Sequence, residues 1–173
     1  MMLSYTIVNT SHDDLPFIYS SFDDAIIYQR QNGFPDWKDY SNEALKEDID
    51  KKRQFKILVN GEVSCILTTC LEDHLVWNEL ELGNTIYLHR IVTNKYFKGL
   101  RLVGKIVSFT NELCKKKGRS KIRSDTWANN ESIIDYYKSF GFKIIRYSFN
   151  PDTPELPIQM RGNKVVLMEY DFA

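Results

Sequence analysis

The sequence predicts one mixed α/β domain, in which a sheet of parallel and antiparallel strands carries helices on both faces. The main observation is the order of the segments: a strand, two helices, a β-hairpin, a strand, a helix, a strand, a helix and two final strands. This order is neither the regular alternation of a doubly wound α/β protein nor an all-β pattern. The second observation is size, because 173 residues of ordinary apolar and charged content can bury a sizeable core as one domain, residues 1–173.

The first half of the chain begins with a strand and two helices and continues as a β-hairpin. Asp13 or Asp14 can cap the first helix, and Ser41 can cap the second, whose many charges predict a place on the surface. Asn60-Gly61 is the strongest hairpin signal in the chain, because both residues tolerate the positive φ angles of a tight turn. The expected bounds are Tyr5–Val8, Leu15–Arg30, Ser41–Lys52, Phe55–Val59 and Glu62–Leu71.

The second half is organised around a strand, a basic turn and a helix. β-branched and aromatic residues predict a strand from Ile86 to Val92, and apolar residues at helical spacing predict a helix from Leu102 to Lys117. An acidic stretch from Glu72 to Glu81 precedes this unit as a loop. The remaining expected elements are a strand at Lys121–Thr126, a helix capped by Asn129 or Asn130 and running to Ser139, and strands at Phe142–Phe149 and Lys164–Tyr170.

In the central unit, the N-terminus of the helix faces the space beyond the carboxyl end of the strand. The first N–H groups of a helix have no partners within it and carry partial positive charge, so an anion such as a phosphate fits there. Lys98, Arg101 and Lys105 add full charges, and Gly99 and Gly104 allow a close backbone approach. Two other interpretations stay open. One is an ordinary strand–loop–helix unit with solvated basic residues, and the other is a P-loop that lacks its magnesium-binding Ser or Thr.

Composition argues against several function classes. The 23 basic residues balance 23 acidic ones, so no overall charge draws the protein to nucleic acid or to a membrane. Cys65, Cys70 and Cys114 form no metal-ligand or disulfide pattern, which suits a reducing compartment and predicts no metal site. The sequence shows no membrane-spanning apolar run and no signal peptide pattern, so we expect a cytoplasmic protein.

Several motifs together resemble one family. Leu88–Thr93 resembles a strand that ends beside a cofactor, and Lys98–Val103 resembles the loop Arg/Gln-x-x-Gly-x-Gly/Ala that follows it. Asn130–Phe142 resembles a later helix that reads Asn…Tyr…Gly-Phe, while Arg123–Trp127 and Asp36-Trp37 resemble features of a bacterial subgroup. On these residues the chain resembles the GNAT superfamily, the Gcn5-related N-acetyltransferases, in its bacterial small-molecule form. The resemblance implies a central twisted mixed sheet of about six to seven strands with helices on both faces.

The resemblance implies that the protein binds acetyl-coenzyme A. In the family, the loop wraps the pyrophosphate and the strand end pairs with the pantetheine arm like an added strand. Three positions depart from the family pattern: Lys98 replaces Arg or Gln, Arg101 stands at the first loop glycine, and Val103 stands at the following Gly or Ala. The implied cofactor-binding residues are Ile91, Val92, Thr93, Lys98, Gly99, Leu100, Arg101, Leu102, Val103, Gly104, Lys105, Asn130 and Tyr137.

The resemblance also implies an N-acetyltransferase, in which a primary amine of a small molecule or peptide attacks the thioester directly in a ternary complex. Tyr137 would be the general acid, because a phenol with a pKa of roughly 10 stays protonated at neutral pH. It also shares a helical face with Ile133 and Ile134, so a core role stays open. His89 on the central strand or Glu81 just before it would be the base. A structural His89, a solvated Glu81 and a relay through water are the alternatives.

The acceptor pocket is the least determined part of the site. Phe34, Trp37 and Tyr40 are expected either to wall this pocket between the first two helices or to pack beneath a loop. The acidic stretch would suit a cationic amine, or it is simply solvated. A second function class stays open, a non-catalytic acyl-CoA-binding module with the same fold, which the departures at Arg101 and Val103 favour. A homodimer is also left open.

Overall fold

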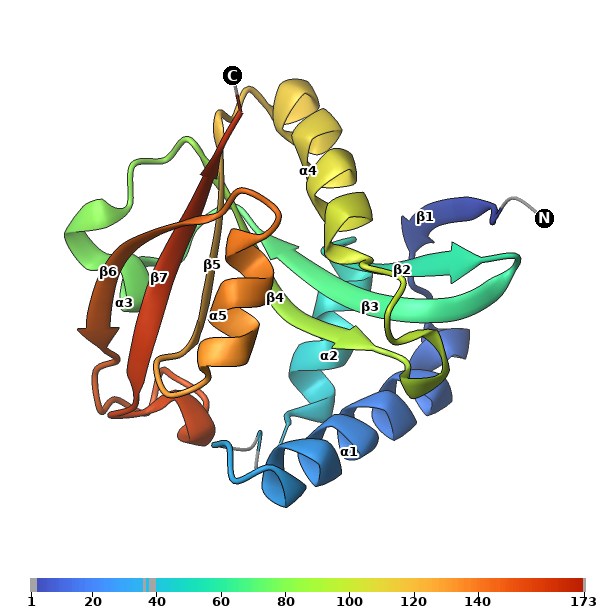
Figure 1. Ribbon diagram of the computed structural model, residues 1–173, viewed down its shortest axis with the longest axis horizontal. Coiled ribbons are helices and arrows are strands. Elements are labelled where there is room, and N and C mark those ends of the chain that lie inside the picture. Colours follow the sequence, from blue (N-terminus) through green and yellow to red (C-terminus); the bar gives the residue numbers. More distant parts are fainter. Residues whose placement is uncertain (1–2, 36, 38–39, 173) are drawn as a thin grey trace.

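A computed structural model describes residues 3–35, 37 and 40–172 of the chain. In this part of the chain, the centre is a seven-stranded mixed sheet with the strand order β1-β2-β3-β4-β5-β7-β6. Helices cover both of its faces, which confirms the predicted fold class (Figure 1). β4 and β5 are parallel neighbours, and the other neighbouring pairs are antiparallel. The strands are β1 (Tyr5–Asn9), β2 (Gln54–Val59), β3 (Glu62–Cys70), β4 (Thr85–Thr93), β5 (Lys121–Trp127), β6 (Lys143–Phe149) and β7 (Lys164–Asp171).

The helices lie close to their predicted positions, and two of the predicted caps are present. Ser41 accepts a hydrogen bond from the backbone N–H of Ala44, and Asn130 caps the last α-helix in the same way. Asp14 precedes the first helix, but its carboxylate makes no capping bond there and pairs instead with Lys56 at 2.6 Å. The helices are α1 (Leu15–Gln31), α2 (Asn42–Asp50), α3 (His74–Trp77), α4 (Val103–Lys117) and α5 (Glu131–Lys138), with short 3-10 helices η1 (His12–Asp14), η2 (Asn78–Leu80), η3 (Lys95–Phe97) and η4 (Ile158–Met160).

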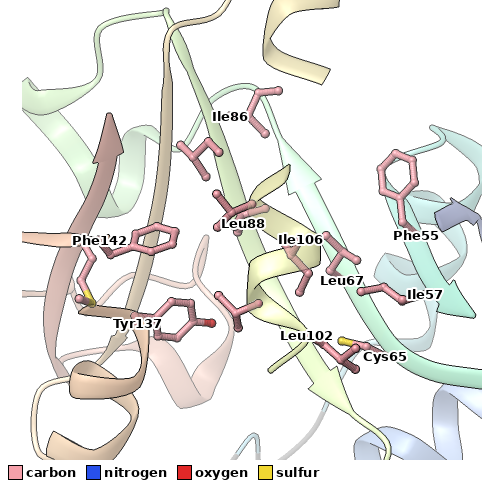
Figure 2. Packing of buried hydrophobic residues seen from close by; sticks show 14 of the residues in the cluster. Phe55, Ile57, Cys65, Leu67, Ile86, Leu88, Leu102, Ile106, Tyr137 and Phe142 are labelled. Carbon is pink, nitrogen blue, oxygen red and sulfur yellow. The ribbon is translucent and has the colours of Figure 1, made fainter. Parts of the chain in front are cut away.

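α4 and α5 cover one face of the sheet. The buried positions of α4 recur at helical spacing, at Val103, Ile106, Val107, Thr110 and Cys114. They form one apolar cluster with Ile86 and Leu88 of β4 and with Tyr137 of α5. Figure 2 shows the Tyr137 ring extending from α5 into this cluster. The burial of this face fixes α4 and α5 against the middle of the sheet.

α1 and α2 cover the opposite face, where they pack on Ile66 of β3 and Val92 of β4. Successive side chains of a strand point to opposite faces. Cys65 and Leu67, on either side of Ile66 in the chain, therefore pack in the apolar cluster beneath α4.

The second helix lies at the surface as expected, and it buries one face. Its exposed residues are Asn42, Glu43, Lys46, Glu47 and Asp50. Leu45 and Ile49 are almost fully buried, because a helix rich in charges can still carry a narrow apolar stripe.

Asp48 ties α2 to the sheet. Its side chain is 3% exposed, and its carboxylate forms ion pairs with Arg53, at 2.7 Å, and with Arg90. Arg90 lies in β4 with a φ of +48°, where the register between β3 and β4 shifts. Such a bulge bends a strand and re-aims its side chains. The ion pair therefore holds an irregular point of β4 against α2.

The sheet divides in its middle. The parallel pairing of β4 with β5 runs from Thr85 and Lys121 to Leu88 and Ser124 and then stops. Both strands continue beyond these residues, so their carboxyl ends separate. In this part, β4 and β5 do not hydrogen-bond to each other, and each has a free edge toward the other. Figure 1 shows β4 and β5 diverging toward α1 and α5. No helix in the described ranges is long and apolar enough to cross a bilayer.

Candidate active site

A cavity of about 1230 Å³ opens where β4 and β5 separate. It is bounded by the carboxyl ends of both strands, by α1, by the start of α2, by α5 and by the segment 156–160. Glu81 and the run from Gly99 to Lys105 do not contribute to its lining. The predicted site residues that line it are Phe34, Trp37, Tyr40, His89, Ile91, Val92, Thr93, Lys98, Asn130 and Tyr137.

Tyr137 reaches the point of separation from α5. Its ring packs edge-on against Phe142, with centroids 5.4 Å apart, and its side chain is almost fully buried. Its hydroxyl is hydrogen-bonded to Ser124, the last residue of β5 that pairs with β4. Burial raises the pKa of this phenol well above its usual range, although the bond to Ser124 opposes the shift. Tyr137 therefore belongs to the core and to the cavity at once, as a protonated donor.

Arg101, which stands where the resembled loop has a glycine, adopts a backbone conformation that favours glycine. Its φ is +51°, in the left-handed region where a side chain costs about 1 kcal/mol. Its guanidinium lies 4.4 Å from the Phe140 ring centre and donates to Ser139 at 3.2 Å. Val103, the other departure, is buried in the cluster beneath α4. Both side chains thus have contacts of their own within the protein.

Gly104 has a different role from the one expected. A Cβ at this position would come 3.2 Å from the Phe140 ring, so the glycine allows Phe140 to pack on the first turn of α4. Gly104 and Lys105 both lie inside α4, which begins at Val103. The P-loop interpretation is therefore wrong, since it needs these residues in a loop around phosphates.

The N-terminus of α4 keeps the features of an anion site. Leu102 stands at the N-cap and makes no side-chain capping bond, while the N–H of Gly104 donates to the carbonyl of Arg101 at 3.1 Å. Two basic side chains flank this end of the helix. Lys98 lies 4.1 Å from the Tyr28 ring centre, and Lys105 lies 4.4 Å from that of Tyr5. These contacts place the Lys98 ammonium over a ring of α1 and the Lys105 ammonium over a ring of β1.

The floor of the cavity carries a group that the sequence did not predict: Asp73, His89 and Asp125. His89 Nε2 lies 3.4 Å from Asp73 Oδ2, and His89 Nδ1 lies 3.8 Å from Asp125 Oδ1. The exposed fractions of the three side chains are 12% for Asp73, 22% for His89 and 7% for Asp125. Of these three residues, the sequence analysis named His89 as a candidate base, while Asp125 lay in the resembled stretch Arg123–Trp127 and Asp73 in the acidic stretch. One ligand atom from each residue lies within 4.8 Å of the others, a spacing that could also hold a metal ion, which the sequence did not lead us to expect.

Burial shifts the pKa values of these three side chains away from their ordinary ranges. It raises the pKa of Asp73 to about 7, helped by the charges of Asp125 and Glu81, and it raises the pKa of Asp125 to about 6. Burial also lowers the pKa of His89 to about 3, with the charge of Arg90 adding to the effect. A neutral imidazole with so low a pKa is a weak base at neutral pH. The carboxylates are better matched to accept a proton there.

Glu81, one of the two candidate bases, makes structural hydrogen bonds. Its carboxylate accepts hydrogen bonds from the backbone N–H groups of Asp73 and Gly83, each at 2.9 Å. Burial alone raises its pKa, but these bonds and one from Tyr87 outweigh burial and lower the pKa. The acidic stretch was expected to be a loop, yet it folds into α3 and η2 around the fully buried Trp77. Glu81 closes this segment and does not line the cavity.

The aromatic residues on the α1 side both pack and line the cavity. Trp37 and Tyr40 lie against Phe22 of α1, with ring centroids 5.3 Å and 5.2 Å apart. Phe34 lines the same wall. Asp36, which contributed to the resemblance, lies outside the described residues. Asn130 likewise combines two roles, because it caps α5 and lines the cavity.

Comparisons with known proteins agree with this architecture. No protein-family model matches the sequence, and no curated protein sequence matches it. Solved structures do match. A GNAT-family acetyltransferase from Listeria monocytogenes is 17% identical with a TM-score of 0.72, over 97% of this chain and 95% of that one. Aminoglycoside acetyltransferase AAC(6')-Ib, in complex with coenzyme A and kanamycin, is 18% identical with a TM-score of 0.70, over 97% and 95% of the two chains. YncA from Salmonella typhimurium, with its cofactor acetyl-CoA, is 12% identical with a TM-score of 0.67, over 98% and 94%.

These likenesses extend over nearly the whole of each chain and identify the architecture. The chain has the fold of the GNAT acetyltransferases. Within this fold, β4 and β5 separate at their carboxyl ends, a loop that contains Arg101 precedes α4, and Tyr137 lies in α5.

Proposed function

We propose that this protein is an N-acetyltransferase, which transfers the acetyl group of acetyl-CoA to a primary amine by direct attack in a ternary complex. The observation that carries the proposal is the position of Tyr137, a buried and protonated phenol at the point where β4 and β5 separate. Structural neighbours with acetyl-CoA, or with coenzyme A and kanamycin, add support. An acceptor of small-molecule or peptide size suits a cavity of about 1230 Å³.

The residues of this chain fit acetyl-CoA in two respects. Beyond Leu88, β4 has an edge that β5 does not pair with, and Ile91 to Thr93 on that part of the strand line the cavity. The N-terminus of α4, without a capping side chain and with Lys98 beside it, would hold the pyrophosphate. The cofactor, when bound, supplies the activated acetyl thioester. The protein supplies the groove, the orientation and the proton at Tyr137.

Acetyl transfer requires three catalytic contributions from the protein. The amine must lose its proton before it attacks, the developing oxyanion needs a donor, and the departing thiolate needs a proton. The Tyr137 hydroxyl can give that proton because burial keeps it protonated. The non-catalytic alternative rested on Arg101 and Val103. It loses this basis, because Arg101 adopts a backbone conformation that favours glycine and Val103 packs inward.

The test is thiol release from acetyl-CoA in the presence of amines, with Tyr137→Phe as the diagnostic variant. We expect kcat to fall about 100-fold, the size of a typical general-acid contribution. The Kd for acetyl-CoA should change by less than about twofold, since the phenol acts in the transition state. Tyr147→Phe, on the exposed side of β6, is the matched control and should behave like the wild type. Unchanged turnover in Tyr137→Phe would remove Tyr137 from the mechanism.

Two further expectations stay proposals. We propose a cytoplasmic protein that forms a homodimer through β6, the edge strand of the sheet. β6 exposes Ile145, Tyr147 and Phe149, the last with 68% of its surface accessible. An apolar edge strand of this kind is prone to pair with another chain. Light scattering on the wild type and on Phe149→Glu would separate a dimer from a monomer.

A further inference from the structure

Asp73 and Asp125 have backbone hydrogen bonds, but in the ranges that the structure describes they lack the lysine or arginine partner that a buried charge normally has. Asp73 Oδ2 is buried and has no hydrogen-bond partner. The Asp125 side chain is more than nine-tenths buried and lines the cavity. Among the described residues, no lysine or arginine forms an ion pair with either carboxylate. Buried carboxylates are normally paired or hydrogen-bonded, so this pair points to a cation from outside the chain.

The neighbouring basic groups are engaged elsewhere. Arg90, which follows His89 in β4, is bound to Asp48 of α2. Lys95 pairs with Asp24 of α1 at 3.2 Å. The His89 ring lies between the two carboxylates, but a neutral imidazole has a single N–H to donate and cannot serve both. The negative charge at this end of the cavity is therefore uncompensated within the described part of the chain.

We propose that Asp73 and Asp125 bind the ammonium group of the acceptor, and that the acceptor is a primary amine without a carboxylate beside its nitrogen. This inference rests on the proposed acetyl transfer and names its substrate class. Carboxylate oxygens less than 4.8 Å apart can each lie about 2.8 Å from one ammonium nitrogen, the usual length of a charge-assisted hydrogen bond. A carboxylate on the acceptor would be repelled by the same pair.

The proton balance follows from this site. The bound ammonium gives one proton to Asp73 and becomes a neutral amine. The amine nitrogen then bonds to the thioester carbon, the carbon–sulfur bond breaks, and the thiolate takes the proton of Tyr137. The second proton leaving the nitrogen restores Tyr137, and Asp73 releases its proton to solvent. The sum is one ammonium and one acetyl-CoA converted to one amide, one coenzyme A and one released proton.

A metal ion is the competing occupant, and the geometry favours it less. One ligand atom from each of the three residues lies within 4.8 Å of the others, but His89 faces Asp73 with Nε2 and Asp125 with Nδ1. A metal ion binds a histidine through one nitrogen only, so a metal would use only one of these two contacts. The aromatic side chains nearby, such as Trp37 and Trp127, suit the carbon skeleton of an organic amine.

The test is calorimetric binding of three matched probes to the protein loaded with coenzyme A, where no transfer can occur. Tyramine is the ammonium probe, tyrosine adds a carboxylate, and 4-ethylphenol lacks the charge. We expect tyramine to bind at least about tenfold more tightly than the other two, as a buried charge-assisted contact would give. Asp73→Asn and Asp125→Asn should each abolish this preference. Asp50→Asn, an exposed aspartate of α2 outside the cavity, is the control and should retain it.

The outcomes separate this inference from the proposed function. If tyramine binds no better than 4-ethylphenol, or if either cavity variant keeps the preference, the ammonium site is refuted. Tight Zn²⁺ binding that excludes tyramine and needs all three side chains would assign the group to a metal and also refute it. Thiol release and acetyl-CoA binding are measured separately, so acetyl transfer can survive either result. A protein that binds no acetyl-CoA would remove the proposed function and this inference with it.

Discussion

Replacing Asp73 by asparagine is expected to stabilise the protein at neutral pH and to have little effect at acidic pH. The folded protein raises the pKa of Asp73 from 3.8 to about 7, chiefly through burial and then through the charge of Asp125. A carboxyl group with a raised pKa favours folding below its unfolded pKa, and this contribution is lost as the pH rises through the folded value. Asparagine has the same shape and keeps an oxygen for the Val76 backbone bond, but it carries no charge.

The size of the effect follows from the shift. Each pKa unit corresponds to about 1.4 kcal/mol, so a shift of about three units corresponds to about 4 kcal/mol at pH 8. The side chain is 12% exposed, and this solvent contact screens part of the penalty. We therefore expect Asp73→Asn to gain about 2–3 kcal/mol at pH 8 and about zero at pH 4. The gain should develop between pH 4 and pH 7.

Urea unfolding of wild type and Asp73→Asn between pH 4 and pH 8 measures this directly. Asp125→Asn supplies an internal check, because it removes one charge that raises the pKa of Asp73. The gain from Asp73→Asn should therefore shrink in the Asp125→Asn background. If Asp73→Asn were less stable than wild type at pH 8, the carboxylate would be satisfied in the fold, and the reasoning about an uncompensated pair would be wrong.

Two other substitutions test how the site is built. Arg101→Ala should be less stable than Arg101→Gly by about 1 kcal/mol in urea unfolding, because both lose the contacts to Ser139 and Phe140 while only alanine keeps a side chain at positive φ. Equal stabilities would contradict the left-handed conformation of this residue. Asp48→Asn should lower the free energy of unfolding by about 3 kcal/mol, because it leaves Arg90 and a second arginine without their buried carboxylate. A loss below about 0.5 kcal/mol would mean that this ion pair does not hold α2 to β4.

Local signals were sufficient to predict most of the fold. The strands and long helices carry period-two or helical patterns, and Ser41 and Asn60-Gly61 mark their boundaries correctly. The acidic stretch was misassigned because its four carboxylates are interleaved with four apolar residues and form no clear helical pattern. Trp77 decides its structure by packing in the core against Tyr87, which is a tertiary contact that no local pattern contains.

The parts of the candidate site that lie within one sequence motif could be predicted, whereas the parts formed by residues from separate segments could not. The loop before α4 and the tyrosine of α5 carry sequence motifs, so both were found. Asp73, His89 and Asp125 come from the start of α3, from β4 and from β5. They meet only because β4 and β5 lie side by side and α3 packs on them. The burial that shifts their pKa values is a property of that assembly and of no single segment.

Calorimetric titration with acetyl-CoA, beside dephospho-CoA and ATP, tests the central claim most directly. The account predicts saturable binding of acetyl-CoA with ATP silent, because the separated strands offer an edge for the pantetheine arm and the N-terminus of α4 offers a site for its pyrophosphate. Absence of acetyl-CoA binding, or equal binding of ATP, would contradict the proposed acetyltransferase and leave only the fold.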